Sequence, residues 1–238
     1  MKVCFERRAT CHCVRLNILS HEHNNPIEKS GSNIYISAIY STLQTVDQEI
    51  TLQPDRSRLY LRRVNASDID DLFRIYGDPA TNTFNPAGPY PDISHARNVM
   101  ARWLNHWENY RFGNWAISLK ENPDRIIGFG GLSIISYDNT PIMNLGYRFS
   151  TESWGKGLAT EFAKYAVGYG FDVLKLAEIS AVVRPNHLAS QKILTKAGLR
   201  FSRNIHDVKN EPASMLFTVT LDEWNNALSR GTTPPIDH

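Results

Sequence analysis

The sequence is poor in cysteine, and its cysteines are confined to one end of the chain. Only three occur among 238 residues, at Cys4, Cys11 and Cys13. The rest of the chain therefore has no residues from which to build a disulfide framework, and the protein needs no oxidising compartment. This composition leads us to expect a cytoplasmic location.

Strong charge and long apolar segments are also absent. The formal net charge is +2, and no dense basic run is present that would bind a nucleic-acid backbone. No apolar run approaches the roughly 20 residues that cross a bilayer, and the first residues lack the apolar core of a secretory signal. We therefore expect neither a nucleic acid nor a membrane as a partner.

The chain divides by composition into an extension, one domain and a tail. Residues 1–53 lack long periodic segments, residues 54–229 carry regular patterns, and residues 230–238 hold two prolines and are expected to fray. The extension also contains a group of side chains of zinc-ligand type, Cys11, His12 and Cys13, followed by His21 and His23. Because their spacing differs from that of the common zinc fingers, we expect no metal site.

Hydrophobic periodicity predicts an alternation of strands and helices over the domain. Strands are predicted at 58–64, 115–119, 125–135, 143–149, 177–183, 199–205 and 214–220, and helices at 65–76, 94–113, 158–173, 189–197 and 222–228. We expect Asn65 or Ser67 to cap the first helix and Ser94 the second. The order of elements predicts a mixed α/β sheet in which antiparallel strands precede one strand–helix–strand crossover.

The segment 77–91 is rich in residues that interrupt regular structure. It holds four prolines and two glycines, which predicts a mobile loop beside a substrate groove. Two acidic residues, Asp78 and Asp92, together with Phe84 and Tyr90, are of types that hold a cationic group.

The most informative stretch, 144–173, has the pattern of a strand, a glycine turn and a helix. Gly155 and Gly157 flank Lys156 at the point where the chain must turn. Apolar residues then recur at three- and four-residue steps, which predicts a helix with one buried face. Unpaired amides and the positive end of the helix dipole both attract a phosphate, so the stretch predicts a site for a phosphorylated cofactor.

Four motifs around this turn resemble those of a known family. They read Leu-Gly-Tyr-Arg-Phe at 145–149, Trp-Gly-Lys-Gly-Leu-Ala-Thr-Glu at 154–161, Arg-Pro-Asn-His-Leu-Ala-Ser at 184–190 and Lys-Ala-Gly-Leu at 196–199. In this order and spacing they resemble the GCN5-related N-acetyltransferases (GNAT). Within that superfamily the resemblance is to the branch containing the ribosomal-protein-alanine N-acetyltransferases, and it covers about residues 54–229.

This resemblance implies both a fold and a reaction. The fold is a mixed, mainly antiparallel central sheet with splayed strands and flanking helices. The reaction is direct attack of a primary amine, on a protein N-terminus or a small molecule, on the co-substrate acetyl-CoA, by a monomer or a homodimer. The pantetheine arm is expected between strands 143–149 and 177–183. The pyrophosphate is expected on Trp154, Gly155, Lys156, Gly157, Leu158, Ala159 and Thr160.

The resemblance also indicates which side chains take part in the chemistry. Ser190 falls on the family's serine and is the candidate to protonate or hydrogen-bond the departing thiolate, since no tyrosine follows in its helix. His187 stands where the family usually has asparagine, with Asn186 one residue earlier. Either residue can hydrogen-bond the cofactor, and Asn186 can equally cap the helix.

The general base is not identified by the family pattern. Asn144 stands where family members often have glutamate, and an amide cannot take up the proton. His187, Glu152 and a bound water are the alternatives, and we take His187 as the base. Tyr147 and Trp115 either line the cleft or pack as ordinary strand residues.

Other functions remain open at this point. The departures at Asn144 and Glu152 are compatible with a non-catalytic acyl-CoA-binding module of the same fold. If the protein is an enzyme, the acceptor amine can be a peptide N-terminus or a small molecule such as a polyamine, an amino acid or an aminoglycoside. A nucleotide-binding P-loop is disfavoured, because Gly-Lys-Gly lacks the spacing of that motif.

Overall fold

The computed structural model describes residues 57–137, 140–208 and 210–230. The predicted extension with its Cys and His residues, and the tail beyond Arg230, lie outside the described residues. None of the helices in the described part is long and apolar enough to cross a membrane. Over the same residues, His, Cys, Asp and Glu side chains do not gather in groups of three or more that could hold a metal ion.

Each predicted strand and helix of the domain is present, with its ends moved by a few residues. The strands are β1 (Leu59–Arg63), β2 (Asn114–Leu119), β3 (Gly128–Tyr137), β4 (Thr140–Phe149), β5 (Glu178–Val183), β6 (Arg200–Ile205) and β7 (Ser214–Thr220). The helices are α2 (Ile69–Tyr76), α3 (Ile93–Tyr110), α4 (Leu158–Asp172), α5 (Leu188–Lys196) and α6 (Leu221–Ser229). Short 3-10 turns are η1 (Ala66–Asp68), η2 (Pro79–Asn82) and η3 (Thr151–Ser153).

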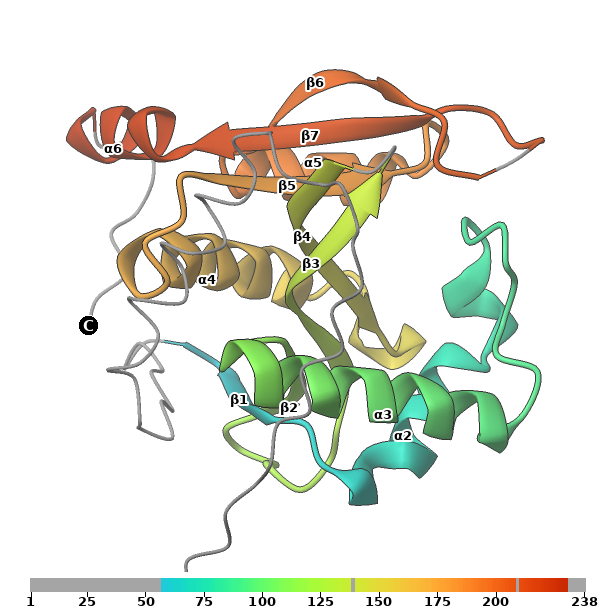
Figure 1. Ribbon diagram of the computed structural model, residues 1–238. Helices are drawn as coiled ribbons and strands as arrows, with labels where there is room; N and C mark the ends of the chain where they lie inside the picture. Colours follow the sequence, from blue (N-terminus) through green and yellow to red (C-terminus); the bar gives the residue numbers. More distant parts are fainter. Residues whose placement is uncertain (1–56, 138–139, 209, 231–238) are drawn as a thin grey trace, which may run out of the picture. The chain divides into compact units, whose positions relative to one another are not determined.

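The strands form one sheet in the order β1-β2-β3-β4-β5-β7-β6 (Figure 1). The first four strands pair antiparallel in sequence order, as short connections favour. Helix α4 then crosses over so that β5 runs parallel to β4. The predicted mixed, mainly antiparallel sheet with a single crossover is therefore confirmed.

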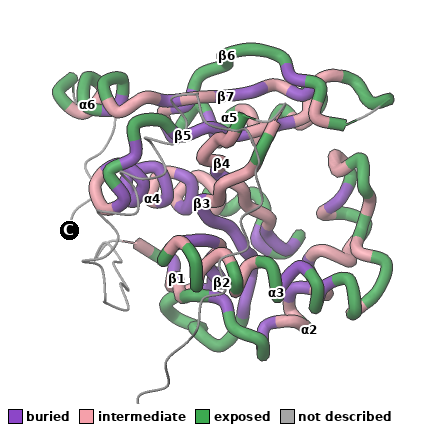
Figure 2. The backbone as a smooth tube through the Cα atoms, in the orientation of Figure 1, coloured by how far each residue is buried: buried purple, intermediate pink, exposed green. Residues whose placement is uncertain are grey.

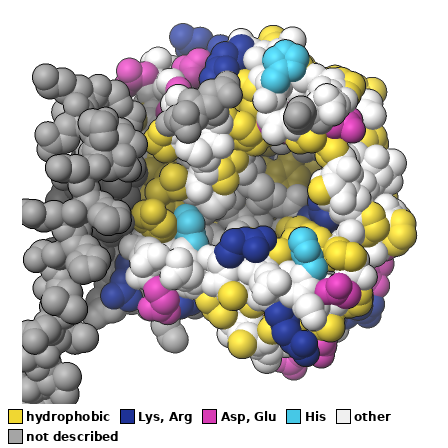
Figure 3. Space-filling view, turned by 45° about the vertical axis from the view of Figure 1, so that its right-hand side comes forward, with side chains coloured by type: hydrophobic (Ala, Val, Ile, Leu, Met, Phe, Trp, Pro, Cys, Tyr) yellow, Lys and Arg dark blue, Asp and Glu magenta, His cyan; other side chains and the backbone are white. Residues whose placement is uncertain are grey.

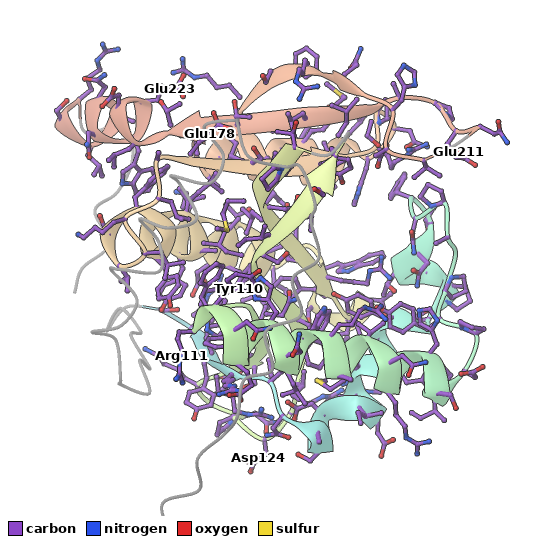
Figure 4. All side chains as sticks on the ribbon, in the orientation of Figure 1. Tyr110, Arg111, Asp124, Glu178, Glu211 and Glu223 are labelled. Carbon is purple, nitrogen blue, oxygen red and sulfur yellow. The ribbon has the colours of Figure 1, made fainter. Side chains whose placement is uncertain are left out.

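The last two strands are ordered differently in space than along the chain. Strands β6 and β7 form the predicted antiparallel pair, with a register shift between Phe201 and Arg203. However, β7 rather than β6 pairs with β5. Arg184, which follows β5, lies 3.4 Å from Glu211 on the β6–β7 connection, and Figure 4 shows Glu211 at the opposite end of β7 from Glu223 of α6. This ion pair ties the end of β5 to that connection.

The two faces of the sheet bury separate cores. Trp115 and Ile117 of β2 pack into a core that includes α4, whereas Ala116 between them packs into a second core with α2 and α3. This alternation is the two-residue period of a strand. Buried residues run through β2 and most of α4, while the outer strand β6 is largely exposed (Figure 2). The central strands are thus held rigidly between two helical layers.

Two of the predicted helix caps can be compared with the structure. Asn65 accepts the Ser67 amide at 2.8 Å and forms a capping box with Asp68, which confirms Asn65 as the cap at the entry to η1 and α2. The prediction of Ser94 as the cap of α3 is wrong. Asp92 has the extended backbone of a cap and accepts the His95 amide at 2.8 Å, so Ser94 lies inside the first turn.

The proline-rich segment 77–91 is tied to the end of α2. Its residues Pro79–Asn82 form η2, which Asp78 caps by accepting the Ala80 amide at 2.9 Å. Asn82 is buried and donates to the backbone carbonyls of Tyr76 and Asp78, each at 2.8 Å. The segment therefore contains a hydrogen-bonded element where the composition predicted a mobile loop.

Candidate active site

Strands β4 and β5 separate toward their carboxyl ends. They form a single ladder pair, Asn144 with Ser180. Beyond it, β4 continues along β3 to Phe149 and β5 along β7 to Val183. The predicted splay is therefore present, and beyond Asn144 and Ser180 the facing backbone groups of the two strands do not pair with each other, which suits an extended ligand.

Strand β4 leads through η3 into the glycine turn. Gly155 has φ of 73° and Gly157 φ of 78°, in the left-handed region that favours glycine. Gly157 is the N-cap of α4 and provides no side chain to cap it. The Thr160 amide bonds the Gly157 carbonyl at 3.1 Å, whereas the amides of residues 155–159 have no acceptor among the described residues. The turn thus presents consecutive unpaired donors at the positive end of a helix.

Arg58 holds this turn in place from the start of β1. Its Nη1 donates to the Lys156 carbonyl at 3.1 Å, and its Nη2 lies 2.8 Å from Glu161 Oε2 in the first turn of α4. Its backbone amide also donates to Glu161 Oε1 at 2.7 Å. This contact was not predicted from the sequence, because Arg58 and Glu161 are 103 residues apart in the chain. The signal available was an acidic residue in the first turn of a predicted helix.

The remaining predicted residues of the turn differ in exposure. Trp154 is 52% exposed, and its indole nitrogen donates to the Phe149 carbonyl at 3.1 Å. The Lys156 side chain is exposed, while Leu158 is buried and anchors the turn in the core. Ala159 is half-buried against the same core. The turn therefore offers a ligand mainly backbone amides, with the Trp154 and Lys156 side chains beside them.

Ser190 is hydrogen-bonded to a residue of β4. Its hydroxyl lies 3.1 Å from the phenolic oxygen of Tyr147, so the pair spans the distance between α5 and β4. Burial raises the pKa of Tyr147 to about 12, partly offset by the bond to Ser190. The phenol is therefore protonated at neutral pH and always has a hydrogen to donate. Sequence analysis left Tyr147 open between cleft and core, and its partnership with Ser190 was not predicted.

His187 lies at the start of α5, against the η2 region. Its ring stacks on Phe84, with centroids 4.1 Å apart and planes 15° apart. Burial, followed by the positive charge of Arg148, lowers the pKa of His187 below its ordinary 6.5. The imidazole is consequently neutral at physiological pH and able to accept a proton.

Asn186 lies in an exposed turn next to His187. The prediction that it caps α5 is wrong, because His187 is the N-cap residue and no side chain caps this helix. The loop is shaped instead by Gln191, whose Nε2 donates to the carbonyls of Arg184 and Pro185 at 3.3 and 2.8 Å. The Asn186 side chain is left accessible to a ligand.

The other candidates for the general base or for lining the cleft differ in their contacts. Glu152 forms an exposed ion pair with Arg125. Trp115 is buried and packs on α4, so the core interpretation of this residue is confirmed. Asn144, at the point where β4 and β5 part, has a buried Oδ1 without a hydrogen-bond partner among the described residues. Such an atom is costly to leave unpaired and marks a place for a ligand or water.

The two acidic residues predicted to hold a cationic acceptor are helix caps in the structure. Asp78 and Asp92 each accept a backbone amide as helix caps. The charged group on this side of β4 is Arg148, whose guanidinium lies 4.3 Å from the Tyr76 ring centroid. The face turned forward in Figure 3 is hollowed at its centre, with basic and histidine side chains along the lower edge. Asp78 and Asp92 thus serve as caps, and their predicted role in holding a cationic acceptor stays a prediction.

Comparisons with known proteins agree with this arrangement. The model of the acetyltransferase (GNAT) domain matches residues 58–200. An uncharacterized N-acetyltransferase of Bacillus licheniformis is 28% identical over 159 residues, which cover 67% of this chain and 88% of the relative.

Two solved structures share the fold. A spermidine N-acetyltransferase from Vibrio cholerae, in complex with CoA and spermine, has a TM-score of 0.59 at 15% identity, covering 72% of this chain and 100% of that one. A ribosomal-protein-S5-alanine acetyltransferase from Vibrio fischeri has a TM-score of 0.58 at 16% identity, covering 71% and 97%. These two structures show the shared fold, and the domain match over residues 58–200, more than half of the chain, shows that the chain belongs to the GNAT acetyltransferase family.

Proposed function

We propose that the protein transfers the acetyl group of acetyl-CoA to a primary amine. The observation that carries this proposal is the row of unpaired amides on the glycine turn, placed directly beyond the splayed end of β4. Phosphate oxygens are the natural acceptors for such a row. The pyrophosphate would be held by Trp154, Gly155, Lys156, Gly157, Leu158, Ala159 and Thr160, with Asn186 bonding another polar group of the cofactor.

Ser190 and Tyr147 would stabilise the departing thiolate. Their oxygens share one hydrogen bond of 3.1 Å, which leaves a second O–H hydrogen available for the sulfur. Full proton transfer from a phenol with a pKa of about 12 to a thiolate, whose conjugate acid has a pKa of about 8.5, is uphill. The pair therefore acts by donating a hydrogen bond to the sulfur, and the proton arrives from solvent or from the acceptor amine.

His187 would accept the proton that the acceptor amine loses. The lowered pKa keeps the imidazole neutral, and the ring is half-buried against Phe84, where a ligand can still approach it. A weak base suffices here. Once the amine nitrogen has bonded to the acetyl carbon it is positively charged and strongly acidic, so it loses its proton readily. Backbone positioning of the thioester supplies much of the remaining rate.

The general test is a thiol-release assay with acetyl-CoA and a broad panel of amines, followed by mass spectrometry of the acceptor. We expect CoA release that depends on an amine and an acceptor heavier by one acetyl group. The His187→Gln variant should lose much of kcat while binding acetyl-CoA normally. Equal kcat in the variant and the wild type would remove His187 from the mechanism.

A second function, a non-catalytic acyl-CoA-binding module, is motivated by Asn144. This amide stands where a carboxylate base would serve, and Glu152 pairs with Arg125 instead of replacing it. Calorimetry showing acetyl-CoA binding, together with no turnover of any amine, would support the module. Turnover that is lost on altering Gly157 would eliminate it.

A further inference from the structure

Arg148 of β4 is a half-buried cation whose neighbours are neutral. Its Nη1 donates to Asn82 Oδ1, and its guanidinium carbon lies 4.3 Å from the Tyr76 ring centroid. Other arginines of the described part, such as Arg62 and Arg184, pair with carboxylates, whereas Arg148 has no carboxylate within ion-pair distance among the same residues. A partly desolvated guanidinium held in a fixed place without a counter-ion is suited to bind an anion from outside.

Arg148 shares one face of β4 with Asn144 and Gly146, because alternate residues of a strand lie on the same side. The opposite face carries Tyr147, which packs on Phe162 of α4. A Cβ at Gly146 would meet only Asn144 Nδ2, at 3.4 Å, so the step between Asn144 and Arg148 is open. Along this face of the strand, the unpaired Oδ1 of Asn144 comes first, then the unfilled space at Gly146, and then the cation of Arg148.

The carboxylates near this face are engaged elsewhere. Asp78 and Asp92 cap η2 and α3. Asp207, on the β6–β7 connection, lies 3.6 Å from Arg184. The charged side chain that acts on His187 is Arg148, whose positive charge contributes to the lowered pKa of that imidazole.

A contact between two aromatic rings connects the segment after η2 with the start of α5, beside the face of β4 that carries Arg148. The stacked rings of Phe84 and His187 join the segment after η2 to the start of α5, although the two residues are far apart in the chain. A bridge of this kind suits a short acceptor better than a peptide that must pass through a groove open at both ends. The strand rises about 13 Å from Asn144 to Arg148, an interval that a short chain between an amine and an anionic group can span.

We propose that the acceptor is a small amine that carries an anionic group, a carboxylate or a phosphate, and that Arg148 binds this group. The Asn144 Oδ1 would accept a hydrogen from the amine as it approaches the thioester. This inference rests on the proposed acetyl transfer and specifies its substrate class. It places polyamines among the poor substrates.

The test compares acceptors that differ only in charge. The panel consists of straight-chain ω-amino carboxylates, their carboxamides, the corresponding aminoalkyl phosphates and diamines of the same lengths. We expect kcat/KM for the preferred anionic series to exceed that for the matched carboxamides and diamines by about 10- to 100-fold, the usual range for one charge-assisted contact. The carboxylate and phosphate series decide between the two anions.

Two variants assign the preference to its residue. Arg148→Gln removes the charge but keeps a side chain that can donate to Asn82. It should reduce the ratio of kcat/KM for anionic acceptors to that for the matched carboxamides to about 2-fold, because only the charge-assisted contact is lost. Arg102→Gln, on the exposed side of α3, is the matched control and should retain the full preference. Calorimetry with CoA should give the same Kd for all three proteins, which also shows that the variants are folded.

The possible outcomes separate the two proposals. Turnover of carboxamides or diamines at rates equal to the anionic series would overturn the anionic acceptor and leave acetyl transfer standing. A uniform loss over the whole panel in Arg148→Gln, or a weaker Kd for CoA, would also overturn it, because the residue would then support the fold or the cofactor. Absence of turnover with every amine, despite CoA binding, would overturn both.

Discussion

The glycine turn allows a quantitative test, because the chain offers a matched control for backbone strain. Gly155 and Gly157 have φ of 73° and 78°, and Gly88, in the segment after η2, has φ of 70°. An alanine Cβ would meet nothing within 4 Å at Gly155 or Gly88, and only Arg58 Nη2, at 3.7 Å, at Gly157. Alanine at each position is therefore strained by its backbone and not by a clash.

The strain has a predictable size. A non-glycine residue in the left-handed region costs about 1–2 kcal/mol. For a domain of this size, each kcal/mol lowers Tm by about 2–4 °C. We expect Gly155→Ala, Gly157→Ala and Gly88→Ala to lose similar stability, seen as similar Tm shifts in thermal unfolding without ligand.

Ligand binding should then distinguish the three variants. At Gly155 and Gly157 the new methyl group lies where a pyrophosphate would approach the unpaired amides, so loss of one or more charge-assisted hydrogen bonds should weaken CoA binding by about 10-fold or more. Gly88→Ala should bind CoA like the wild type. Calorimetric Kd values for Gly155→Ala and Gly157→Ala that match those of Gly88→Ala would refute the assignment of this turn to the cofactor.

Three further predictions concern the side chains. Tyr147→Phe and Ser190→Ala should each lower kcat by about 10- to 100-fold with little change in the Kd of acetyl-CoA, and unchanged kcat in both would show that the pair does not bond the sulfur. The acid limb of kcat/KM against pH should lie below pH 6.5 and move upward in Arg148→Gln, because removing a positive charge raises the pKa of His187; an unmoved limb would assign it to another group. Burial lowers the pKa of His106, so the unfolded chain binds more protons than the folded protein, and the free energy of unfolding should fall as the pH drops below 6.5. Denaturant titration of the wild type and of His106→Asn measures this fall. An equal fall in the variant would contradict the prediction.

Much of the fold could be predicted from local pattern. Each strand and helix follows from periodicity, and Gly155 and Gly157 mark the turn because few other residues adopt a left-handed backbone. The error at Ser94 came from the same kind of reasoning, since Asp92 two residues earlier is an equally good cap. The hydrogen-bonded η2 was missed because composition records the prolines but not the bonds made by Asn82.

The candidate site was predictable only where its residues are neighbours in the chain. The glycine turn is one continuous segment, so its residue types and spacing were sufficient to predict its backbone, while its role in cofactor binding stays a prediction. The Tyr147–Ser190 pair, the Phe84–His187 stack and the support from Arg58 join distant segments, and no local pattern encodes such contacts.

The sequence by itself determined the elements, their order and the left-handed glycine turn before α4, because each depends on interactions over a few residues. The tertiary structure alone decided that β7 separates β5 from β6, that β4 and β5 part after Asn144, and that Arg148 lacks a carboxylate partner among the described residues. These features depend on which distant segments pack together, and that choice is made by burial over the whole domain. The predicted cofactor turn is thus a local property of the chain, whereas the acceptor preference that we infer is a property of the fold.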